Sequence, residues 1–452
     1  MSEVQLRVPR GLSTRLIAEI NRPGKREAVV FGLVGHARAS GRDLILLRDL
    51  IVPPESAFLP SNGHGARWTG AFSIELLNRA LAQRLGVFIF HAHGMERTVS
   101  LSRDDVQSAR EQLPRFQMII PERPHGSIVF AHESAAGLVA MPHQDQLTST
   151  ITVRCLQDGA LRTWPLPEAS DAEYLEFQRL RLAAAPLIHR ILRRSVVAVV
   201  GLSGGGSQAI MHLAALGVGE IIGIDPQRAD SSNRHATPQL GWLEARLGVH
   251  KVTPARWRVW FTNRRTRFTG VKSSVPEAAA LSALKRADII VGCVNNYHAR
   301  ADLNDVAWRY CIPYVDIGLR VATRETAEIA QLSGVPGQCI TAIPGGPCLW
   351  CSDFLTEEKL QRETGGRGRS YLQGATGLDA LVSPFNGTLA GEAALEVLRL
   401  LTGIGAERDL RRQYDGLEGT LLPMVVKPKV NCPLCSTTLA VGDPLWAKVQ
   451  GG

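Results

Sequence analysis

Two histidines at the end of an apolar run, together with an acidic helix start, could hold a metal ion. The run FIFHAH places His91 and His93 two residues apart, and strand alternation puts both imidazoles on one face. Ser102 and Asp105 follow in SLSRDDV. Zinc hydrolases commonly use three nitrogen and oxygen ligands and leave one position for water. His91, His93 and Asp105 could be those ligands, although Ser102 and Asp105 also fit an ordinary helix-capping pair.

This order, His-x-His and then Ser-x-x-Asp, resembles the motif of the JAB (JAMM, MPN-plus) metalloisopeptidases, whose fold is of the cytidine-deaminase-like α+β type. The family also needs an upstream glutamate near the start of an early strand, and Glu27 in KREAVVFGLVG stands there. The resemblance implies that Glu27 is the general base on the zinc-bound water and that Ser102 stabilises the oxyanion. Gly94 replaces a usual proline, and the gap to Asp105 is one residue longer than most. Asp104 would restore the gap but break the Ser-to-Asp spacing, so it stays a rival ligand.

A second set of residues could bind a nucleotide. GLSGGGS, from Gly201 to Ser207, is a Gly-rich turn between an apolar strand and a helix, where backbone N–H groups and the helix dipole favour phosphate. Asp225 ends the next apolar run, EIIGID, where it could hydrogen-bond a ribose as in dinucleotide folds. Up to this point a dehydrogenase would fit as well.

The motifs that follow distinguish an activating enzyme from a dehydrogenase. They are DPQRADSSNRHATPQLG, GVHKV, ADIIVGCVNNYHARADLN and IPYVDIGL, and they resemble the ThiF/MoeB/ubiquitin-activating superfamily over nearly all of residues 171–440. The resemblance implies adenylation, in which the C-terminal carboxylate of a ubiquitin-like protein attacks the α-phosphate of ATP while Mg2+ and cationic side chains neutralise charge. The implied nucleotide-binding residues are Gly201, Gly204, Gly206, Asp225, Asn233, Arg234, Lys251 and Asn295.

Two positions depart from that superfamily. Asn295 stands where an aspartate near Mg2+ and the α-phosphate is usual. Because asparagine keeps the size of aspartate but loses its charge, metal handling and turnover are in question. Arg234 directly follows Asn233, whereas related enzymes often place the arginine a few residues on. A polar surface loop would also explain these residues.

Four cysteines form two CxxC pairs, Cys348 with Cys351 and Cys432 with Cys435. Such paired spacing predicts a closed, structural zinc site that staples two distant segments. Thioester-forming activating enzymes usually carry a nucleophilic cysteine between these pairs, but residues 352–431 contain none. Whether this chain forms a thioester is therefore open. The other cysteines are Cys155, Cys293, Cys311 and Cys339, of which Cys339 could be exposed.

The elements that must position these residues fall into two α/β groups. Short β-rich runs and two helical patterns predict an α+β domain over residues 1–145, followed by a linker and helical lead-in over 146–195. Apolar runs without alternation, such as ADIIVGCV, predict a doubly wound, Rossmann-like domain over 196–440, and 441–452 reads as a tail. Within this domain, 256–267 alternates arginines with apolar residues, which predicts a half-buried strand.

Composition narrows the class of partner. A chain of 452 residues with 45% hydrophobic and 21% charged residues fits a two-domain globular protein. It has no apolar stretch of membrane-spanning length and no signal-peptide pattern, so we expect no membrane and a cytoplasmic location. The net charge of +9 is mostly dispersed, and we do not expect nucleic acid to be the partner.

Together these patterns predict a prokaryotic fusion of two enzymes. One half would process or remove a ubiquitin-like protein with a catalytic zinc, and the other would adenylate its C-terminal glycine with ATP and Mg2+. The resemblance further implies a homodimer, a conjugating enzyme as partner and a role in antiviral defence. One alternative is trimming and activation of a ThiS- or MoaD-like sulfur carrier for thiocarboxylate formation. Another is a pseudoenzyme scaffold that binds ATP and the ubiquitin-like protein without turnover, which Asn295 motivates.

Overall fold

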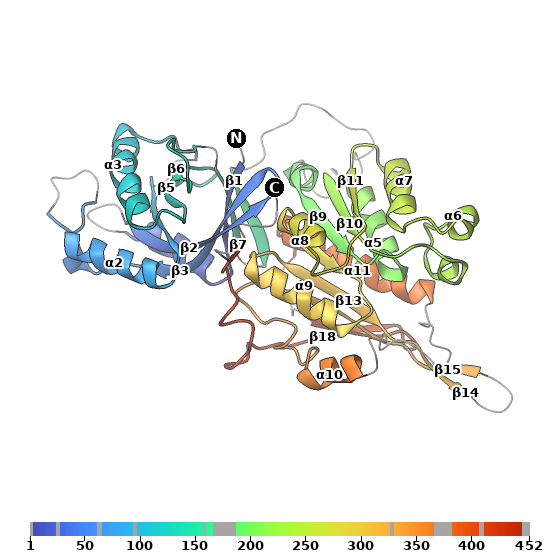
Figure 1. Cartoon of the computed structure of the whole chain (residues 1–452). Helices are drawn as coiled ribbons and strands as arrows, with labels where there is room; N and C mark the ends of the chain where they lie inside the picture. The colour runs from blue at the N-terminus through green and yellow to red at the C-terminus, as the bar shows by residue number, and fades with distance from the viewer. Residues whose placement is uncertain are drawn as a thin grey trace.

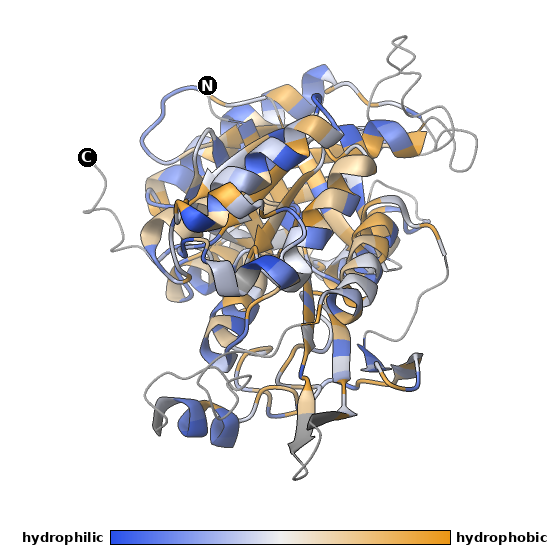
Figure 2. Ribbon diagram, turned by 90° about the vertical axis from the view of Figure 1, so that its right-hand side faces the viewer, coloured by the Kyte–Doolittle hydropathy of each residue, from blue (hydrophilic) through white to orange (hydrophobic). Residues whose placement is uncertain are grey.

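Two eight-stranded sheets lie next to each other, the first in the blue and cyan part of the chain and the second in the green to orange part (Figure 1). The strands at the centre of each half are apolar, and amphipathic helices cover them (Figure 2). No helix in the described part of the chain is long and apolar enough to cross a membrane. The computed structural model describes residues 3–23, 28–60, 66–93, 97–149, 151–157, 159–165, 187–325, 330–365, 382–405 and 411–444.

The first sheet is mixed, in the order β6-β5-β4-β2-β3-β1-β7-β8. Alternation along β4 directs Ile89 toward α2 and α3 on one face, and Phe88 and Phe90 toward the α1 side on the other. The strands are β1 (Glu3–Val8), β2 (Val30–Ala39), β3 (Arg42–Ile51), β4 (Gly86–Ala92), β5 (His125–Phe130), β6 (Ala135–Ala140), β7 (Ile151–Gln157) and β8 (Ala160–Trp164). The helices are α1 (Leu12–Ile20), the 3-10 turn η1 (Glu55–Ala57), α2 (Gly70–Ala82) and α3 (Arg103–Ile119).

The first sheet extends beyond the expected boundary at residue 145. Strands β7 and β8 lie inside the segment 146–195, which the sequence suggested to be a linker and lead-in, and β7 pairs in parallel with β1. The cause is the alternation of Ile151, Val153 and Cys155, whose side chains enter the core of the first half.

The second sheet is parallel at one end and antiparallel at the other, in the order β11-β10-β9-β12-β13-β16-β17-β18. Its parallel half, with helices on both faces, confirms the Rossmann-like prediction. The strands are β9 (Val196–Val200), β10 (Glu220–Ile224), β11 (Arg267–Val271), β12 (Ile289–Gly292), β13 (Tyr314–Leu319), β16 (Pro336–Ala342), β17 (Arg411–Asp415) and β18 (Thr420–Met424), with a separate hairpin of β14 (Ala322–Glu325) and β15 (Ala330–Gly334). The helices are α5 (Gly204–Ala215), η3 (Ser231–Ala236), α6 (Trp242–Arg246), α7 (Val252–Thr262), α8 (Ala278–Lys285), α9 (Tyr297–Arg309), α10 (Glu357–Gly365) and α11 (Ser383–Thr402).

The predicted strand at 256–267 was wrong, because most of this segment is helix α7. The alternation of arginine with apolar residues lasts only a few positions. Val252, Ala255 and Val259 are buried at helical spacing, and this longer pattern decides the structure. As a result Trp257, Trp260 and Phe261 are exposed side chains rather than core residues.

The two halves share a core and a set of buried polar contacts. Leu44 and Leu46 of the first sheet pack in one hydrophobic cluster with Ile290 of the second. Arg7 is 3% exposed, and its guanidinium donates hydrogen bonds to the carbonyls of Tyr310, Lys285 and Ala287 across the boundary, each at 3.0 Å. Because a buried arginine needs such partners, this contact fixes how the halves meet.

Part of the expected C-terminal tail, residues 441–444, is built into that boundary. Gly442 forms a parallel bridge with His36 of β2, and the Asp443 N–H donates to the His36 carbonyl at 2.8 Å. The Asp443 carboxylate accepts from the Tyr310 hydroxyl at 2.8 Å, on the other half of the molecule. The end of the described chain thus ties the second half back to the first.

A buried histidine should make the stability of the first half depend on pH. His125 is 0% exposed, its Nδ1 accepts from the Val87 N–H and its Nε2 donates to the Ile120 carbonyl. Burial lowers the pKa of His125 from 6.5 to about 4, although the bond to Ile120 opposes this. As pH falls from 6.5 towards 4, the unfolded chain binds a proton that the folded chain does not, so up to about 3 kcal/mol of stability is lost. Urea unfolding at pH 7.5, 5.5 and 4.5 measures the loss.

The matched control is His125→Gln, whose amide can accept and donate at the same places. The difference in unfolding free energy between wild type and variant should shrink as pH falls through this window. Parallel losses in the two proteins would show that other groups cause the dependence.

Candidate functional site

A pocket of about 1140 Å³ opens at the carboxyl ends of the parallel strands of the second sheet. It lies where β10 and β12 diverge on either side of β9, the position at which doubly wound sheets bind their ligands. The turn after β9, the loop after β10 and the turn between β12 and α9 all contribute to its lining.

Glycine is required at two positions of the turn after β9. Gly201 has a φ of +86°, and a Cβ there would lie 2.7 Å from the Cys293 carbonyl oxygen. A Cβ on Gly206 would lie 1.8 Å from the Gly201 carbonyl oxygen. These contacts keep the start of α5 close to the strand, so its first N–H groups are directed at the pocket. Gly204 lines the pocket, while Gly206 is buried behind it.

Asp225 and Lys251 connect this turn to the neighbouring loop. The Asp225 carboxylate accepts from the N–H groups of Leu202 and Gln227, at 2.7 and 2.8 Å, and a carboxylate keeps further lone pairs for a ribose. Lys251 is 3% exposed, and its ammonium donates to Ser203 Oγ at 2.6 Å and Gln227 Oε1 at 2.7 Å. The pocket therefore holds a positioned cation beside the Gly-rich turn.

The other predicted nucleotide residues are placed less uniformly. Asn295 lines the pocket after β12, whereas Arg234 is exposed on η3 and is not among the described lining residues. The side chain of Asn233 lies outside the described residues. Arg228 lines the pocket instead, and its place in DPQRAD, three residues after Asp225, was the signal that could have found it.

Two acidic side chains of the pocket were also missed by sequence reasoning. Asp230 and Asp302 both line it. Burial raises the pKa of Asp302, against the effect of nearby His298. Asp302 lies seven positions beyond Asn295, in the second turn of α9, so no short motif marked it.

The structure brings His91, His93 and Asp105 together at the end of β4 and the start of α3. Nε2 of His91 lies 3.1 Å from Asp105 Oδ1, and Nε2 of His93 lies 3.4 Å from Asp105 Oδ2. The three ligand atoms are all within 4.8 Å of one another. Tetrahedral zinc with bonds of 2.0–2.1 Å would hold such atoms about 3.3 Å apart, so the residues fit this ion. Asp104 is exposed and is not part of the group.

Ser102 and Asp105 also form the helix-capping pair that was considered from the sequence. The Ser102 N–H donates to Asp105 Oδ2 at 2.7 Å, and Ser102 Oγ accepts from the Asp105 N–H at 3.1 Å. Burial works to raise the pKa of Asp105, but hydrogen bonds from His91 and Ser102 outweigh it and hold that pKa well below its usual range. The cap fixes the carboxylate against the imidazoles. Glu27 and Gly94 lie outside the described residues.

The four CxxC cysteines meet in one cluster, which joins the segment after β16 to the segment after β18. Sulfur-to-sulfur distances are 3.8 Å for Cys348 and Cys351, 3.5 Å for Cys348 and Cys432, and 3.8 Å for Cys351 and Cys435. Zinc with Zn–S bonds of 2.3 Å sets tetrahedral sulfurs about 3.8 Å apart. The cluster therefore has the geometry of a closed zinc site.

The remaining cysteines are not arranged as nucleophiles. Cys155, Cys311 and Cys339 are buried and Cys293 is half-buried, so the exposure considered for Cys339 is not found. Burial raises the pKa of Cys311 to about 12 and raises the pKa of each of the other three above its usual range. A reactive cysteine needs the opposite shift, toward thiolate at neutral pH.

Comparison with known proteins decides between a dehydrogenase and an activating enzyme. A profile of the ThiF family matches residues 179–434. The chain belongs to the ThiF family. The match covers the second sheet, its pocket and three of the four clustered cysteines, and it ends one residue before Cys435. The second sheet with its helices and the whole cysteine cluster is called the ThiF half below. The first sheet, called the N-terminal half, lies outside the match.

Curated relatives agree with this assignment. The chain is 27% identical over 245 residues to the SAMP-activating enzyme E1 of Haloferax volcanii, covering 54% of this chain and 81% of the relative. It is 24% identical over 256 residues to the sulfur carrier protein ThiS adenylyltransferase of Escherichia coli K12, covering 56% and 89%. A solved structure of E. coli MccB with ATP is 17% identical, with a TM-score of 0.47, and covers 58% of this chain and 75% of that chain.

Proposed function

We propose that the ThiF half is an ATP-dependent adenylyltransferase that activates the C-terminal carboxylate of a ubiquitin-like protein. One observation carries the proposal: a ThiF-family chain holds a buried lysine, a Gly-rich turn and Asp225 around a single pocket. The names of its relatives, a SAMP-activating enzyme and a ThiS adenylyltransferase, support the substrate class.

The residues of the pocket suit the steps of adenylation. N–H groups at the start of α5 meet phosphate oxygens, and Asp225 accepts from the ribose hydroxyls. Ser203 and Gln227 accept from the Lys251 ammonium and hold it beside the Gly-rich turn, where its charge would meet the phosphates. As the carboxylate of the ubiquitin-like protein attacks the α-phosphate, negative charge moves onto the departing pyrophosphate, and a fixed cation lowers the barrier.

The pocket also contains oxygen ligands that suit Mg2+. Carboxylates are the groups that this ion prefers, and Asp230 and Asp302 lie in the lining together with Asn295. They supply negative charge that Asn295 lacks. We therefore favour turnover over the pseudoenzyme alternative, which rested on Asn295.

The acyl-adenylate is the proposed end product of this chain. Its cysteines outside the zinc cluster are buried or half-buried, with pKa values raised by burial, so none suits attack on the adenylate. A second protein would then supply the nucleophile. This observation favours a separate conjugating enzyme or, as in the sulfur-carrier alternative, an external sulfur donor.

Pyrophosphate exchange tests the adenylation proposal. Purified protein, labelled pyrophosphate and ATP are mixed with candidate ubiquitin-like or sulfur-carrier proteins that end in Gly-Gly, each also prepared with an amidated C-terminus. Exchange should require the free carboxylate and should leave no thiol-sensitive bond between carrier and enzyme. A candidate that binds with ATP present but supports no exchange would instead indicate the scaffold.

For the N-terminal half we propose a zinc-dependent isopeptidase that acts on the same ubiquitin-like protein. His91, His93 and Asp105 would hold the ion, which when bound lowers the pKa of its water ligand. Ser102 Oγ accepts from the Asp105 N–H, which leaves its hydroxyl proton free to stabilise a developing oxyanion, and Glu27 would be the general base. The homodimer, the cytoplasmic location and the antiviral role stay predictions of the sequence resemblance.

Measuring the zinc content tests the proposed metal site of the N-terminal half and needs no substrate. Mass spectrometry should find two zinc ions per chain in wild type and one in the His91→Ala/His93→Ala double variant. Asp105→Asn should also lose one ion, because its carboxylate faces both imidazoles.

Asp104→Asn is the matched control and should keep both ions, since Asp104 lies outside the group. One zinc ion in every protein, wild type included, would reject the metal site. Asp105 would then only cap α3 and pair with the two histidines.

A further inference from the structure

A second cavity, of about 1040 Å³, lies at the junction of the two halves and is distinct from the nucleotide pocket and from the His91 cluster. It surrounds β8, and every residue from Ala160 to Trp164 contributes to its lining. Its other walls come from the first sheet, from residues 191–195 before β9 and from residues 401–403 at the end of α11. The His91 cluster faces α3 on the opposite side of the first sheet.

Strand β8 is the edge of its sheet. The strand order ends with β7 and β8, and β8 pairs with β7 alone. Within the described residues, no backbone hydrogen bond from β8 to any segment other than β7 is seen. An edge strand presents a row of N–H and C=O groups to which another extended segment can pair. The C-terminal end of α11 packs against β8 and forms one wall of the cavity. Among the described residues, the row of edge groups on β8 borders this cavity.

The lining of this cavity is basic. Arg194, before β9, and Arg162, on β8, are both exposed. Glu3 is the single carboxylate among the described lining residues, and it is held by Arg42 at 2.9 Å and Thr152 at 2.9 Å. The basic lining residues are Arg42, Arg97, His132, Arg154, Arg162 and Arg194. Three of them are already ion-paired: Arg42 with Glu3, Arg97 with Glu133 and Arg154 with Asp288.

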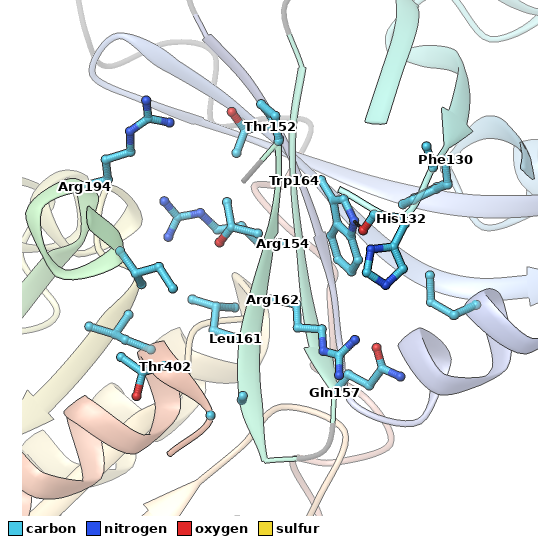
Figure 3. Close-up of a pocket in the computed structure, with 18 of the residues that line it drawn as sticks. Phe130, His132, Thr152, Arg154, Gln157, Leu161, Arg162, Trp164, Arg194 and Thr402 are labelled. Atoms are coloured by element: carbon cyan, nitrogen blue, oxygen red, sulfur yellow. Dashed lines mark hydrogen bonds between the residues drawn. The ribbon is translucent and has the colours of Figure 1, made fainter. Parts of the chain in front are cut away.

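Lining residues of the cavity lie on both sides of the β7–β8 hairpin (Figure 3). Arg154 and Arg194 lie on one side of it. Trp164 and His132 lie on the other, where the Trp164 ring packs edge-on against Phe130 at 6.0 Å. Side chains of an added strand alternate between two faces, so such a strand would meet arginines on one face and an aromatic wall with Arg162 on the other.

Two buried polar atoms are left without partners at this place. Arg154 is 9% exposed, and although its guanidinium pairs with Asp288, its Nε has no hydrogen-bond partner among the described residues. The side-chain oxygen of Gln157 is likewise unpartnered. Buried polar groups are normally hydrogen-bonded. Arg154 Nε needs an acceptor and Gln157 Oε1 needs a donor, and a peptide backbone supplies both.

We propose that this cavity is a docking site for an extended acidic peptide of a partner protein, which adds to β8 as a further strand. The edge backbone gives such a peptide its hydrogen bonds, and the arginines select carboxylate side chains. A compact anion would use the arginines but not the edge of β8. The site is separate from the zinc and nucleotide sites, so its occupation could hold a partner while either half acts.

Fluorescence anisotropy on the full chain tests the proposal with a labelled probe, the peptide Glu-Val-Glu-Val-Glu-Val-Glu. The probe should bind saturably, and the same peptide with lysine in place of glutamate should bind at least tenfold more weakly. Arg162→Glu and Arg194→Glu should each weaken binding at least tenfold. Arg115→Glu, an exposed charge reversal on α3 outside the cavity, is the control and should change binding less than twofold.

Backbone pairing is tested with two N-methylated probes. Only alternate residues of an added strand point their N–H groups at the edge, so methylation of one alternate set should abolish binding and methylation of the other should not. Equal effects of the two probes would overturn the added strand. The docking site would be overturned if the probe did not bind saturably, or if Arg115→Glu weakened binding as much as the cavity variants do. Thermal unfolding at the wild-type midpoint confirms that the variants are folded.

Discussion

Lys251→Ala is expected to lower ATP–pyrophosphate exchange by about 100-fold or more in the presence of a cognate carrier. Loss of one positioned group that stabilises transition-state charge typically costs 10²–10³ in rate. Lys251 fits that role because its ammonium is buried at the Gly-rich turn and is oriented by Ser203 and Gln227. Exchange assays on purified variants measure the effect.

Lys427→Ala is the matched control, because Lys427 is exposed and lies outside the pocket. It should exchange at the wild-type rate. Both variants should keep the wild-type thermal midpoint within a few degrees, since the bonds from the Lys251 ammonium to Ser203 and Gln227 go to neutral oxygens and each such bond contributes only about 1 kcal/mol. Exchange within threefold of wild type in Lys251→Ala would remove the lysine from the mechanism.

The second large effect is expected from the cysteine cluster. A Cys348→Ser/Cys432→Ser double variant should lose one zinc ion per chain and most of the stability of the ThiF half. Structural zinc contributes about 10 kcal/mol or more of apparent binding free energy, and here it joins segments that are far apart in sequence. Zinc analysis and thermal unfolding, with and without a chelator, measure both consequences.

Cys293→Ser is the control, because it removes a cysteine that lies outside the cluster. It shows whether the loss of zinc and stability is specific to the clustered cysteines. It should keep the wild-type zinc content. If the double variant retained its zinc and its midpoint, the cluster would be four reduced thiols held by packing alone.

Features written in short stretches of sequence were predictable. The unalternating runs of β9, β10 and β12 gave the parallel sheet, since strands buried on both faces are apolar throughout. The glycines around Gly201 and the paired cysteines were predictable because backbone approach and tetrahedral zinc each restrict residue type and spacing.

Features that depend on distant parts of the chain could not be predicted from the sequence. Helix α7 was misread because four residues of alternation hid a longer helical period, and the side of the helix that faces the core decides the outcome. Asp302 and Arg228 reach the nucleotide pocket from different segments, so no local pattern marked them. Strands β7 and β8 looked like a connection because β8 is short and only the pairing with β1 gives the hairpin its place.

The way the last described residues return to the first sheet has a consequence for the history of the chain. Arg7 donates to three carbonyls of the ThiF half, and Asp443 joins β2 to Tyr310. If either half were moved into another protein by recombination, the Arg7 guanidinium would lose its carbonyl partners. The backbone of β2 at His36 would lose the segment that pairs with it. Gene fission should therefore be rare in this lineage, and substitutions near Arg7, Asp443 and Tyr310 should appear together when homologous sequences are aligned.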